Sequence, residues 1–312
     1  MTSAPTTATN GHAPEWLASL HPSNAACIER LLALPAPPSF THVPTRKQAA
    51  VAAILYESRS SPTPHLCVIM STRALHLRSH PGQASLPGGK VDATDASVVE
   101  TALRESVEEI ALPAGLAVHV HTGYPFLSKM GLLVHPVVFF LRGAGDEILE
   151  RLVASPSEVA AIWTYPLAAV LSSTAPPDLP LSDPATVDTH RPPQHAFRTY
   201  TDIPWLGSTY RLHRFRSTHQ LIKGLTADVL ISVAHKAYGR AARYSVNADA
   251  QRSWEDMVEL VLSKYMGAQR AEQRWGDGES GDVQGSSEAF ATHVGVDDGE
   301  EPKEELEQGG SV

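Results

Sequence analysis

Residues 86–112 carry the pattern that most constrains the fold of this 312-residue chain. Ser97, followed three residues later by Glu100, is a capping-box signature that marks a helix start, and Pro113 ends the run. Between them, four apolar residues recur at helical spacing: Val99, Leu103, Val107 and Ile110. This run is therefore predicted to form an amphipathic helix that packs this apolar face against a core.

Three carboxylates, those of Glu105, Glu108 and Glu109, fall on the opposite arc of this helix and are predicted to face away from the core. Their mutual repulsion is on the order of 3 kcal/mol per pair, at a separation of about 5 to 6 Å and an effective dielectric constant of about 20. A hard divalent cation, Mg²⁺ or Mn²⁺, would reverse the sign of that energy. The pattern favours a metal site over a merely solvated acidic helix face once its surroundings are considered.

Those surroundings are a glycine turn and an arginine. Pro87, Gly88 and Gly89 form a turn in which residues without Cβ let the backbone approach a ligand or cation closely. Arg104 stands beside Glu105, where a guanidinium can orient a neighbouring carboxylate through a charge-assisted hydrogen bond. A glycine pair alone is an ordinary turn, but the combination predicts a site that handles a metal and an anion.

In this order the residues resemble the motif of the Nudix hydrolases. The match is carried by Gly89, Asp95 in place of a glutamate, Arg104, Glu105, Glu108, Glu109 and Leu112. Fourteen residues separate Gly89 from Arg104 where the family motif has thirteen, and Ser106 stands at an aliphatic position. Ala111 replaces the final glycine, so it must close the helix without the easy left-handed conformation of glycine.

The preceding residues, 69–89, resemble the motif of the coenzyme A diphosphatase branch of that superfamily. The matching positions are Arg73, Ala74, Arg78, Gly82, Pro87, Gly88 and Gly89. Arg73 and Arg78 supply planar guanidinium groups suited to phosphate oxygens, although two solvated arginines beside a strand are the plain alternative. Weaker similarity extends the resemblance over roughly residues 46–240, with Lys223 at a position where that branch commonly has an aromatic residue.

The resemblance implies an α/β fold, a Nudix-type α/β/α sandwich with a mixed sheet. A single catalytic domain is expected over 46–268, with a loop insertion at 172–210. Residues 1–45 are expected to be a tail with a short helix and a Pro-rich linker, and 269–312 an acidic disordered tail. Strands are predicted at 48–56, 65–71, 117–124 and 132–141, helices at 24–34, 224–240 and 253–266, and mixed strand and helix signals at 158–171.

The resemblance also implies an activity and residue roles. The expected reaction is metal-dependent cleavage of the diphosphate of coenzyme A or a derivative into 4′-phosphopantetheine and adenosine 3′,5′-bisphosphate. The expected roles are catalysis by Glu105, oriented by Arg104, metal binding by Glu105, Glu108, Glu109 and Gly89, substrate binding by Arg73, Arg78, Gly82 and Gly88, and support of Arg104 by Asp95. Two alternatives stay open: another substrate such as ADP-ribose, a dinucleotide or an oxidised nucleotide, or a non-catalytic binding module.

Composition narrows the expected partners to small molecules. Residues 277–312 hold eleven of the 34 acidic residues and one of the 25 basic ones, giving −10, so the rest of the chain sums to +1. No basic run favours nucleic acid, and the longest apolar run, 131–141, is too short to span a bilayer.

The two cysteines form no disulfide framework, which favours an intracellular location. Cytoplasm, peroxisome and mitochondrion stay open, with no C-terminal Ser-Lys-Leu, and the sequence leaves the oligomeric state open.

Overall fold

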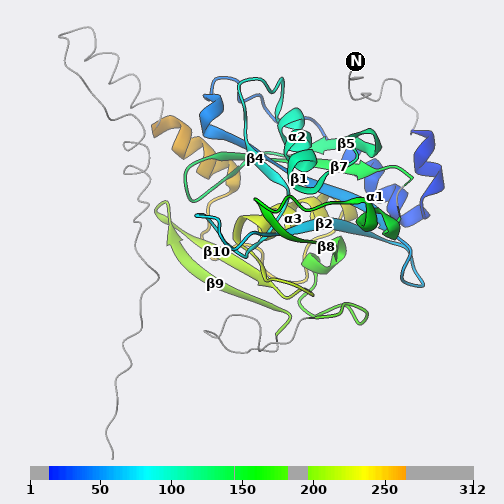
Figure 1. Ribbon diagram of the computed structural model, residues 1–312. Helices are drawn as coiled ribbons and strands as arrows, with labels where there is room; N and C mark the ends of the chain where they lie inside the picture. Colours follow the sequence, from blue (N-terminus) through cyan, green and yellow to red (C-terminus); the bar gives the residue numbers. More distant parts are fainter. Residues whose placement is uncertain (1–13, 144, 182–195, 265–312) are drawn as a thin grey trace, which may run out of the picture.

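The computed structural model describes residues 14–143, 145–181 and 196–264, which are built around one large mixed sheet (Figure 1). The sheet order is β3-β2-β1-β7-β5, and β4 pairs with β1, β6 with β7, and β8 with β2. The strands are β1 (Gln48–Ser58), β2 (His65–Arg73), β3 (Ala84–Ser85), β4 (Gly88–Lys90), β5 (Ala117–Thr122), β6 (Phe126–Leu127), β7 (Leu133–Leu141) and β8 (Val159–Pro166). The sheet is mixed because β1 and β7 run parallel while the other pairs are antiparallel.

Helices cover both faces of this sheet. Residues of α2 (Val98–Ile110) share one apolar cluster with alternate residues of β1 such as Ala50 and Ile54. Residues of α1 (Pro22–Leu32) and α3 (Gly224–Tyr238) share a second cluster with the other face of β1, represented by Leu55. The predicted α/β/α sandwich with a mixed sheet is confirmed. A strand buried on both faces is expected to be largely apolar, as β1 is between Ala49 and Tyr56 and as β7 is apart from His135.

A second, three-stranded antiparallel sheet corrects the prediction of a loop at 172–210. It consists of β9 (Arg198–Trp205), β10 (Ser208–Phe215) and β11 (Ile222–Lys223). Leu206 and Gly207 both have positive φ at the β9–β10 turn, as a tight two-residue hairpin requires. Residues 182–195 of the predicted loop lie outside the described residues. The hairpin escaped prediction because β9 lacks a continuous apolar run.

The remaining elements follow the predicted order. Residues 254–264 are helical, and the Ser253 hydroxyl accepts the backbone N–H of Asp256 at 3.0 Å, as the predicted capping pair requires. Short 3-10 helices occur at Glu15–Ser19, Thr45–Lys47 (η2), Ala114–Leu116, Asp146–Arg151 and Leu167–Leu171. Within the described ranges, no helix is both long enough and apolar enough to span a membrane. The predicted acidic tail, 269–312, and residues 1–13 of the predicted N-terminal tail lie outside these ranges.

The buried face of α2 differs from the predicted one. Val107 is 43% exposed, whereas Ala102 and Ser106 are fully buried against the sheet. The Ser106 hydroxyl donates to the backbone oxygen of Ala102 at 2.6 Å, so this polar group is satisfied where an aliphatic residue was expected. The helix is rotated toward its small residues, and Glu109 is carried inward to 5% exposure. The prediction that all three carboxylates face away from the core is therefore wrong for Glu109.

Ala111 ends α2 in the left-handed conformation, with φ 51° and ψ 40°. This corrects the expectation that an alanine there must close the helix in another way. Its N–H donates to the oxygen of Val107 at 3.0 Å, and the N–H of Leu112 donates to the oxygen of Ser106 at 3.2 Å. An L-residue with a Cβ adopts this conformation at a cost of roughly 1 to 2 kcal/mol.

Replacing Ala111 by glycine should therefore raise the free energy of unfolding by about 1 kcal/mol, because glycine adopts the left-handed conformation without the Cβ clash. Denaturant unfolding would measure the change. Ala33 is the matched control, since it ends α1 with φ −80°. Ala33→Gly should be neutral or destabilising, and equal effects at both positions would contradict this account of the α2 terminus.

A buried carboxyl links α3 to the second sheet. Asp228 of α3 is 7% exposed and accepts a hydrogen bond from the Tyr210 hydroxyl of β10. Burial raises the pKa of the Asp228 carboxyl from its ordinary value of 3.8 to about 7, and the Tyr210 hydrogen bond opposes that rise. Since the folded-state pKa lies above the unfolded one, this carboxyl stabilises the fold fully below pH 4. That contribution is lost as the pH rises towards 7.

In Asp228→Asn we expect residue 228 to make a contribution to the unfolding free energy that does not depend on pH. The amide keeps an acceptor for the Tyr210 hydroxyl and does not titrate. The unfolding free energy of the variant relative to the unmodified protein should rise between pH 5 and pH 7 by roughly 1 kcal/mol per pH unit. Chemical denaturation at several pH values measures this difference. A difference that stays constant over this interval would show that Asp228 is already ionised in the folded protein.

Candidate functional site

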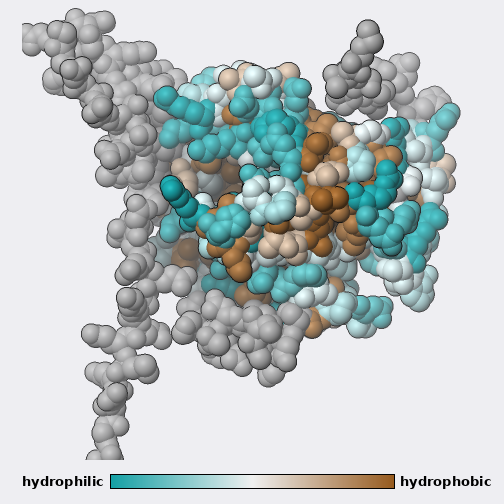
Figure 2. Space-filling view, in the orientation of Figure 1, coloured by the Kyte–Doolittle hydropathy of each residue, from teal (hydrophilic) through white to brown (hydrophobic). Residues whose placement is uncertain are grey.

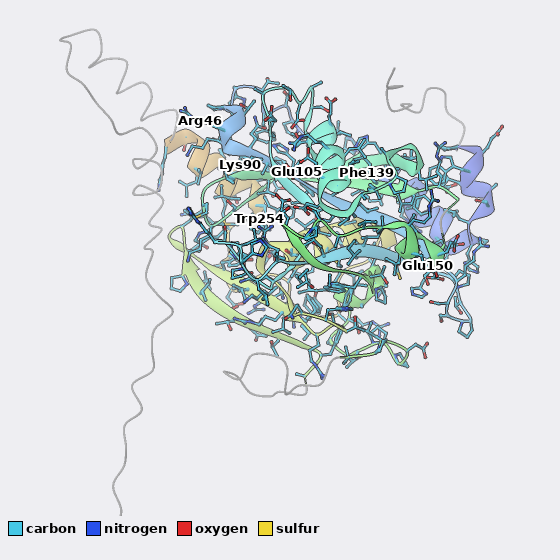
Figure 3. The ribbon with its side chains drawn as sticks, in the orientation of Figure 1. Arg46, Lys90, Glu105, Phe139, Glu150 and Trp254 are labelled. Atoms are coloured by element: carbon cyan, nitrogen blue, oxygen red, sulfur yellow. The ribbon has the colours of Figure 1, made fainter. Side chains whose placement is uncertain are left out.

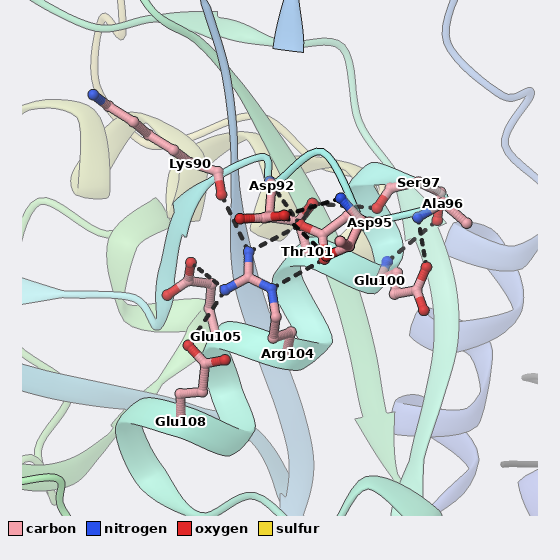
Figure 4. A network of polar contacts seen from close by, with 11 residues as sticks. Lys90, Asp92, Asp95, Ala96, Ser97, Glu100, Thr101, Arg104, Glu105 and Glu108 are labelled. Carbon is pink, nitrogen blue, oxygen red and sulfur yellow. Dashed lines mark hydrogen bonds and ion pairs between the residues drawn. The ribbon is translucent and has the colours of Figure 1, made fainter. Parts of the chain in front are cut away.

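An ion pair between Arg104 and Asp95 forms the centre of the polar network shown in Figure 4. Arg104 donates from Nε to Asp95 Oδ1 at 3.0 Å and from Nη2 to Asp95 Oδ2 at 2.9 Å. Its Nη2 also donates to the backbone oxygen of Lys90 in β4 at 3.2 Å. The guanidinium thus holds together the helix, the loop before it and the strand that carries the glycine pair.

The loop between β4 and α2 is organised around two aspartates. Asp95 accepts from the backbone N–H of Asp92 at 2.9 Å and from the Thr101 hydroxyl at 2.8 Å, and Arg104 lowers the pKa of Asp95 to about 2. Asp92 in turn accepts from the backbone N–H of Thr94 at 2.9 Å. These turns accommodate the extra residue before Arg104, so Asp95 reaches the guanidinium despite the changed spacing.

The start of α2 has the two side-chain hydrogen bonds of the predicted capping box, but one of them joins a neighbouring residue. The Ser97 hydroxyl accepts the N–H of Glu100 at 3.2 Å. The Glu100 carboxylate accepts from the N–H of Ala96 at 2.6 Å, one residue before the position that a standard capping box uses. The helix start is therefore fixed on both sides, which sets the rotation of the carboxylates further along.

Arg104 also contacts two of the three predicted metal-binding carboxylates. Its Nη1 donates to Glu105 Oε1 at 2.8 Å and to Glu108 Oε2 at 3.3 Å. The Glu105 side chain is 14% exposed and that of Glu108 is 56% exposed. Burial raises the pKa of Glu105, while the hydrogen bond from Arg104 lowers it. One cation is thus shared by two carboxylates of unequal burial.

The two glycines of β4 allow close packing against both β1 and α2. A Cβ on Gly89 would overlap the carboxylate of Glu105, and one on Gly88 would overlap the backbone of Ala50 and Val51. Gly88 pairs with Val51, and Gly89 with Ala50, in the antiparallel register of β1 and β4. The structure therefore places Gly88 and Gly89 beside the carboxylates, and a Cβ is excluded by backbone atoms at Gly88 and by the Glu105 carboxylate in its present position at Gly89.

Glu109 lies deepest of the three carboxylates. Burial, together with the negative charges of Glu105 and Glu158, raises its pKa to about 8. The charge of Arg73 and a hydrogen bond from the Gly88 backbone oppose this rise. Glu109 is thus a buried acid whose charge is incompletely compensated by the residues around it.

The segment after β2 brings only part of the predicted phosphate site together. Arg73, at the end of β2, lies close enough to Glu109 to affect its titration, and its Nε donates to the oxygen of Ser79 at 3.4 Å. Gly82 has φ +67° and donates its N–H to the oxygen of Arg73 at 3.1 Å, which closes the loop. Arg78 is exposed on this loop, and no described residue forms a polar contact with its side chain.

Glu158 is a residue of this cluster that the sequence did not single out. It lies immediately before β8, and its backbone oxygen accepts the N–H of Ala74 at 2.9 Å. The pairing of Arg73 with Val159 in the β2–β8 register places it there. No spacing in the sequence marks Glu158, because its position depends on two strands that are far apart along the chain.

The donor set suits a hard cation only in part. Among the residues that the structure describes, no three His, Cys, Asp or Glu side chains are arranged as a complete metal site. Glu105 and Glu109 are nevertheless buried carboxylates with raised pKa values and carboxylate neighbours, which is the charge imbalance that a divalent cation relieves. Oxygen ligands alone are the kind that Mg²⁺ and Mn²⁺ accept, with water or substrate completing the shell.

Comparison with known proteins shows similarity to the Nudix family over the part of the chain that contains this site. Residues 46–183 match the NUDIX domain family model. The chain is 33% identical over 198 residues to Nudix hydrolase 15, mitochondrial, of Arabidopsis thaliana, across 62% of this chain and 60% of that protein's length. It is 32% identical over 197 residues to the uncharacterized Nudix hydrolase NudL of Salmonella paratyphi B, across 63% of this chain and 86% of that one.

Among solved structures, a Nudix hydrolase from M. smegmatis aligns with a TM-score of 0.32 at 19% identity, over 39% of this chain and 71% of that chain. At this level of similarity the alignment identifies neither a substrate nor the role of any residue.

We expect Gly89→Ala to weaken Mn²⁺ binding at least about tenfold, because the added Cβ would displace the Glu105 carboxylate. Isothermal titration of the protein with Mn²⁺ would measure the change. Gly115→Ala is the matched control, since a Cβ there meets no atom within 4 Å. Undiminished Mn²⁺ affinity in Gly89→Ala would exclude Glu105 as a ligand in its present position.

Proposed function

This chain belongs to the Nudix hydrolase family, and we propose that it hydrolyses the diphosphate bond of coenzyme A or one of its derivatives. The products would be 4′-phosphopantetheine and adenosine 3′,5′-bisphosphate. The observation that carries the choice of substrate is the 69–89 segment, whose arginine and glycine spacing matches the coenzyme A diphosphatase motif and whose Arg73 lies beside Glu109. The family's carboxylate helix alone is compatible with many diphosphates.

Members of the family generally use divalent metal ions. In our proposal Mg²⁺ or Mn²⁺ is held by Glu105, Glu108 and Glu109, with the Gly89 carbonyl as a further oxygen ligand. When bound, the metal neutralises the diphosphate and lowers the pKa of a water ligand. With its raised pKa, which reflects burial and neighbouring carboxylates, Glu109 would have to lose its proton to serve as a ligand of the cation.

Glu105 is proposed as the residue that accepts the proton of the attacking water. Arg104 donates a 2.8 Å hydrogen bond to the Glu105 carboxylate, and Asp95 in turn holds Arg104. These two residues therefore orient the Glu105 carboxylate. The water oxygen forms a bond to phosphorus, the bridging phosphorus–oxygen bond breaks, and the leaving phosphate takes that electron pair. Arg104 and Asp95 act by positioning Glu105.

Substrate contacts are assigned to residues around the glycine turn. Arg73 and Arg78 would bind phosphate oxygens through their guanidinium groups. Gly88 lets the diphosphate approach the backbone, and Gly82 sets the loop that carries Arg78. The exposed position of Arg78 suits a residue that closes on the substrate.

The decisive assay compares coenzyme A, ADP-ribose and NADH side by side with Mg²⁺, with the products separated by chromatography. We expect kcat/KM to be highest for coenzyme A. We also expect Glu109→Gln to lower kcat for coenzyme A by at least about a hundredfold, because the amide cannot neutralise the cation.

Glu100→Gln is the matched control on the same helix, since Glu100 caps the α2 start and does not belong to the carboxylate cluster. It should retain activity. Preferred turnover of ADP-ribose or NADH would replace the proposed substrate, and absence of turnover of all three would point to a binding module.

A further inference from the structure

Three basic side chains to which the proposed reaction gives no role lie at the edge of the site. Arg46 and Lys47 belong to η2, which leads directly into β1, and Lys90 ends β4. The register of β1 and β4 pairs Ala49 with Lys90, and the N–H of Val91 donates to the oxygen of Gln48 at 3.1 Å. Figure 3 shows Arg46 and Lys90 on the same side of the molecule as Glu105.

The positive charge of this group, which we call the η2–β4 basic cluster (Arg46, Lys47 and Lys90), is concentrated. Burial lowers the pKa of Lys47, and the charges of Arg46 and Lys90 lower it further, so the three groups repel one another. In the described part of the chain, neither Arg46 nor Lys90 forms an ion pair with a carboxylate. The repulsion favours an anion that all three can approach.

The cluster lies at a fixed and short distance from the glycine turn. Lys90 follows Gly89 directly, and consecutive Cα atoms lie about 3.8 Å apart. The backbone oxygen of Lys90 is held by Arg104 at 3.2 Å, so the strand cannot shift relative to the carboxylates. With about 3.3 Å per strand residue and the length of a lysine side chain, the Lys90 ammonium group lies on the order of 10 Å from the turn.

That distance matches the separation of two phosphate groups on one nucleotide. The surface over α2 and β4 is hydrophilic, which suits a charged ligand there (Figure 2). A phosphate monoester carries close to two negative charges at neutral pH, and Arg and Lys both bind such groups through charge-assisted hydrogen bonds. A diphosphate seated at Gly89 would present a phosphate elsewhere on the same ribose to the cluster.

We propose that Arg46, Lys47 and Lys90 bind the phosphate monoester on the ribose of the substrate, which is the 3′-phosphate in coenzyme A. This inference rests on the proposed function, which places the diphosphate beside Gly89. The cluster selects adenosine diphosphates that carry a ribose phosphate over those with a free ribose hydroxyl. It thereby separates coenzyme A from ADP-ribose and NADH, which present the same diphosphate to the carboxylate helix.

The test measures binding of the nucleotide end alone to the full-length protein. Adenosine 3′,5′-bisphosphate should bind at least about tenfold more tightly than AMP in isothermal titration calorimetry. Lys90→Gln and Arg46→Gln should remove most of that preference, and Lys90→Arg should keep it, because the positive charge is retained.

Arg142→Gln is the matched control. Arg142 is an exposed arginine just after the end of β7, at the opposite end of the β1–β7 pair from Gln48. It should leave the preference unchanged. Equal binding of the two nucleotides by the unmodified protein would overturn the inference, as would an unchanged preference in both Lys90→Gln and Arg46→Gln.

A kinetic comparison distinguishes this inference from the proposed function. Lys90→Gln and Arg46→Gln should each lower kcat/KM for coenzyme A by about tenfold. They should leave kcat/KM for 3′-dephospho-coenzyme A unchanged. Absence of coenzyme A turnover would overturn the proposed function, while the nucleotide titration would still decide the role of the cluster. Equal loss for both substrates would overturn the cluster's assignment to the ribose phosphate.

Discussion

The ion pair between Asp95 and Arg104 is the interaction on which the site depends. Asp95 is only 3% exposed, so its charge is tolerated because the guanidinium binds both of its oxygens. The same guanidinium reaches the backbone of Lys90 and the carboxylates of Glu105 and Glu108. A single half-buried ion pair therefore connects three parts of the chain: the glycine strand, the connecting loop and the acidic helix.

Around that pair the charges are arranged in two zones. The carboxylates of α2, joined by Glu158, form a negative zone in which burial and mutual repulsion raise the pKa of Glu109. Arg73 lies on one side of it, and the η2–β4 basic cluster lies beyond the glycine turn. An anionic ligand that also carries a metal ion suits this arrangement. Its cation would lie beside the carboxylates of the negative zone, and its phosphates would lie beside the basic residues.

Local features of this fold could be predicted from sequence, and features that depend on distant pairing could not. The limits of α2 and the cap at Ser97 follow from residues within a few positions of each other, as do the apolar strands β1 and β7. The rotation of α2 was not predictable, since it follows from Ala102 and Ser106 fitting against the sheet. The β9–β10 hairpin was missed because β9 lacks a continuous apolar run. Glu158 was missed because its place beside the site depends on the pairing of β2 with β8, two strands that are far apart along the chain.

The depth of Glu109 in the last turn of α2 has a consequence for how this chain can change. Unpaired carbonyl groups make the C-terminal end of a helix negative, and the last turn of α2 contains no basic residue. An acidic residue at this position therefore destabilises the fold. Its presence is explained by its proposed role in the site. In a lineage selected for thermal tolerance alone, position 109 would be among the first to lose its charge. The resulting proteins would be more stable and would lack the proposed activity, so a gain in stability at this position of the helix would accompany a loss of function.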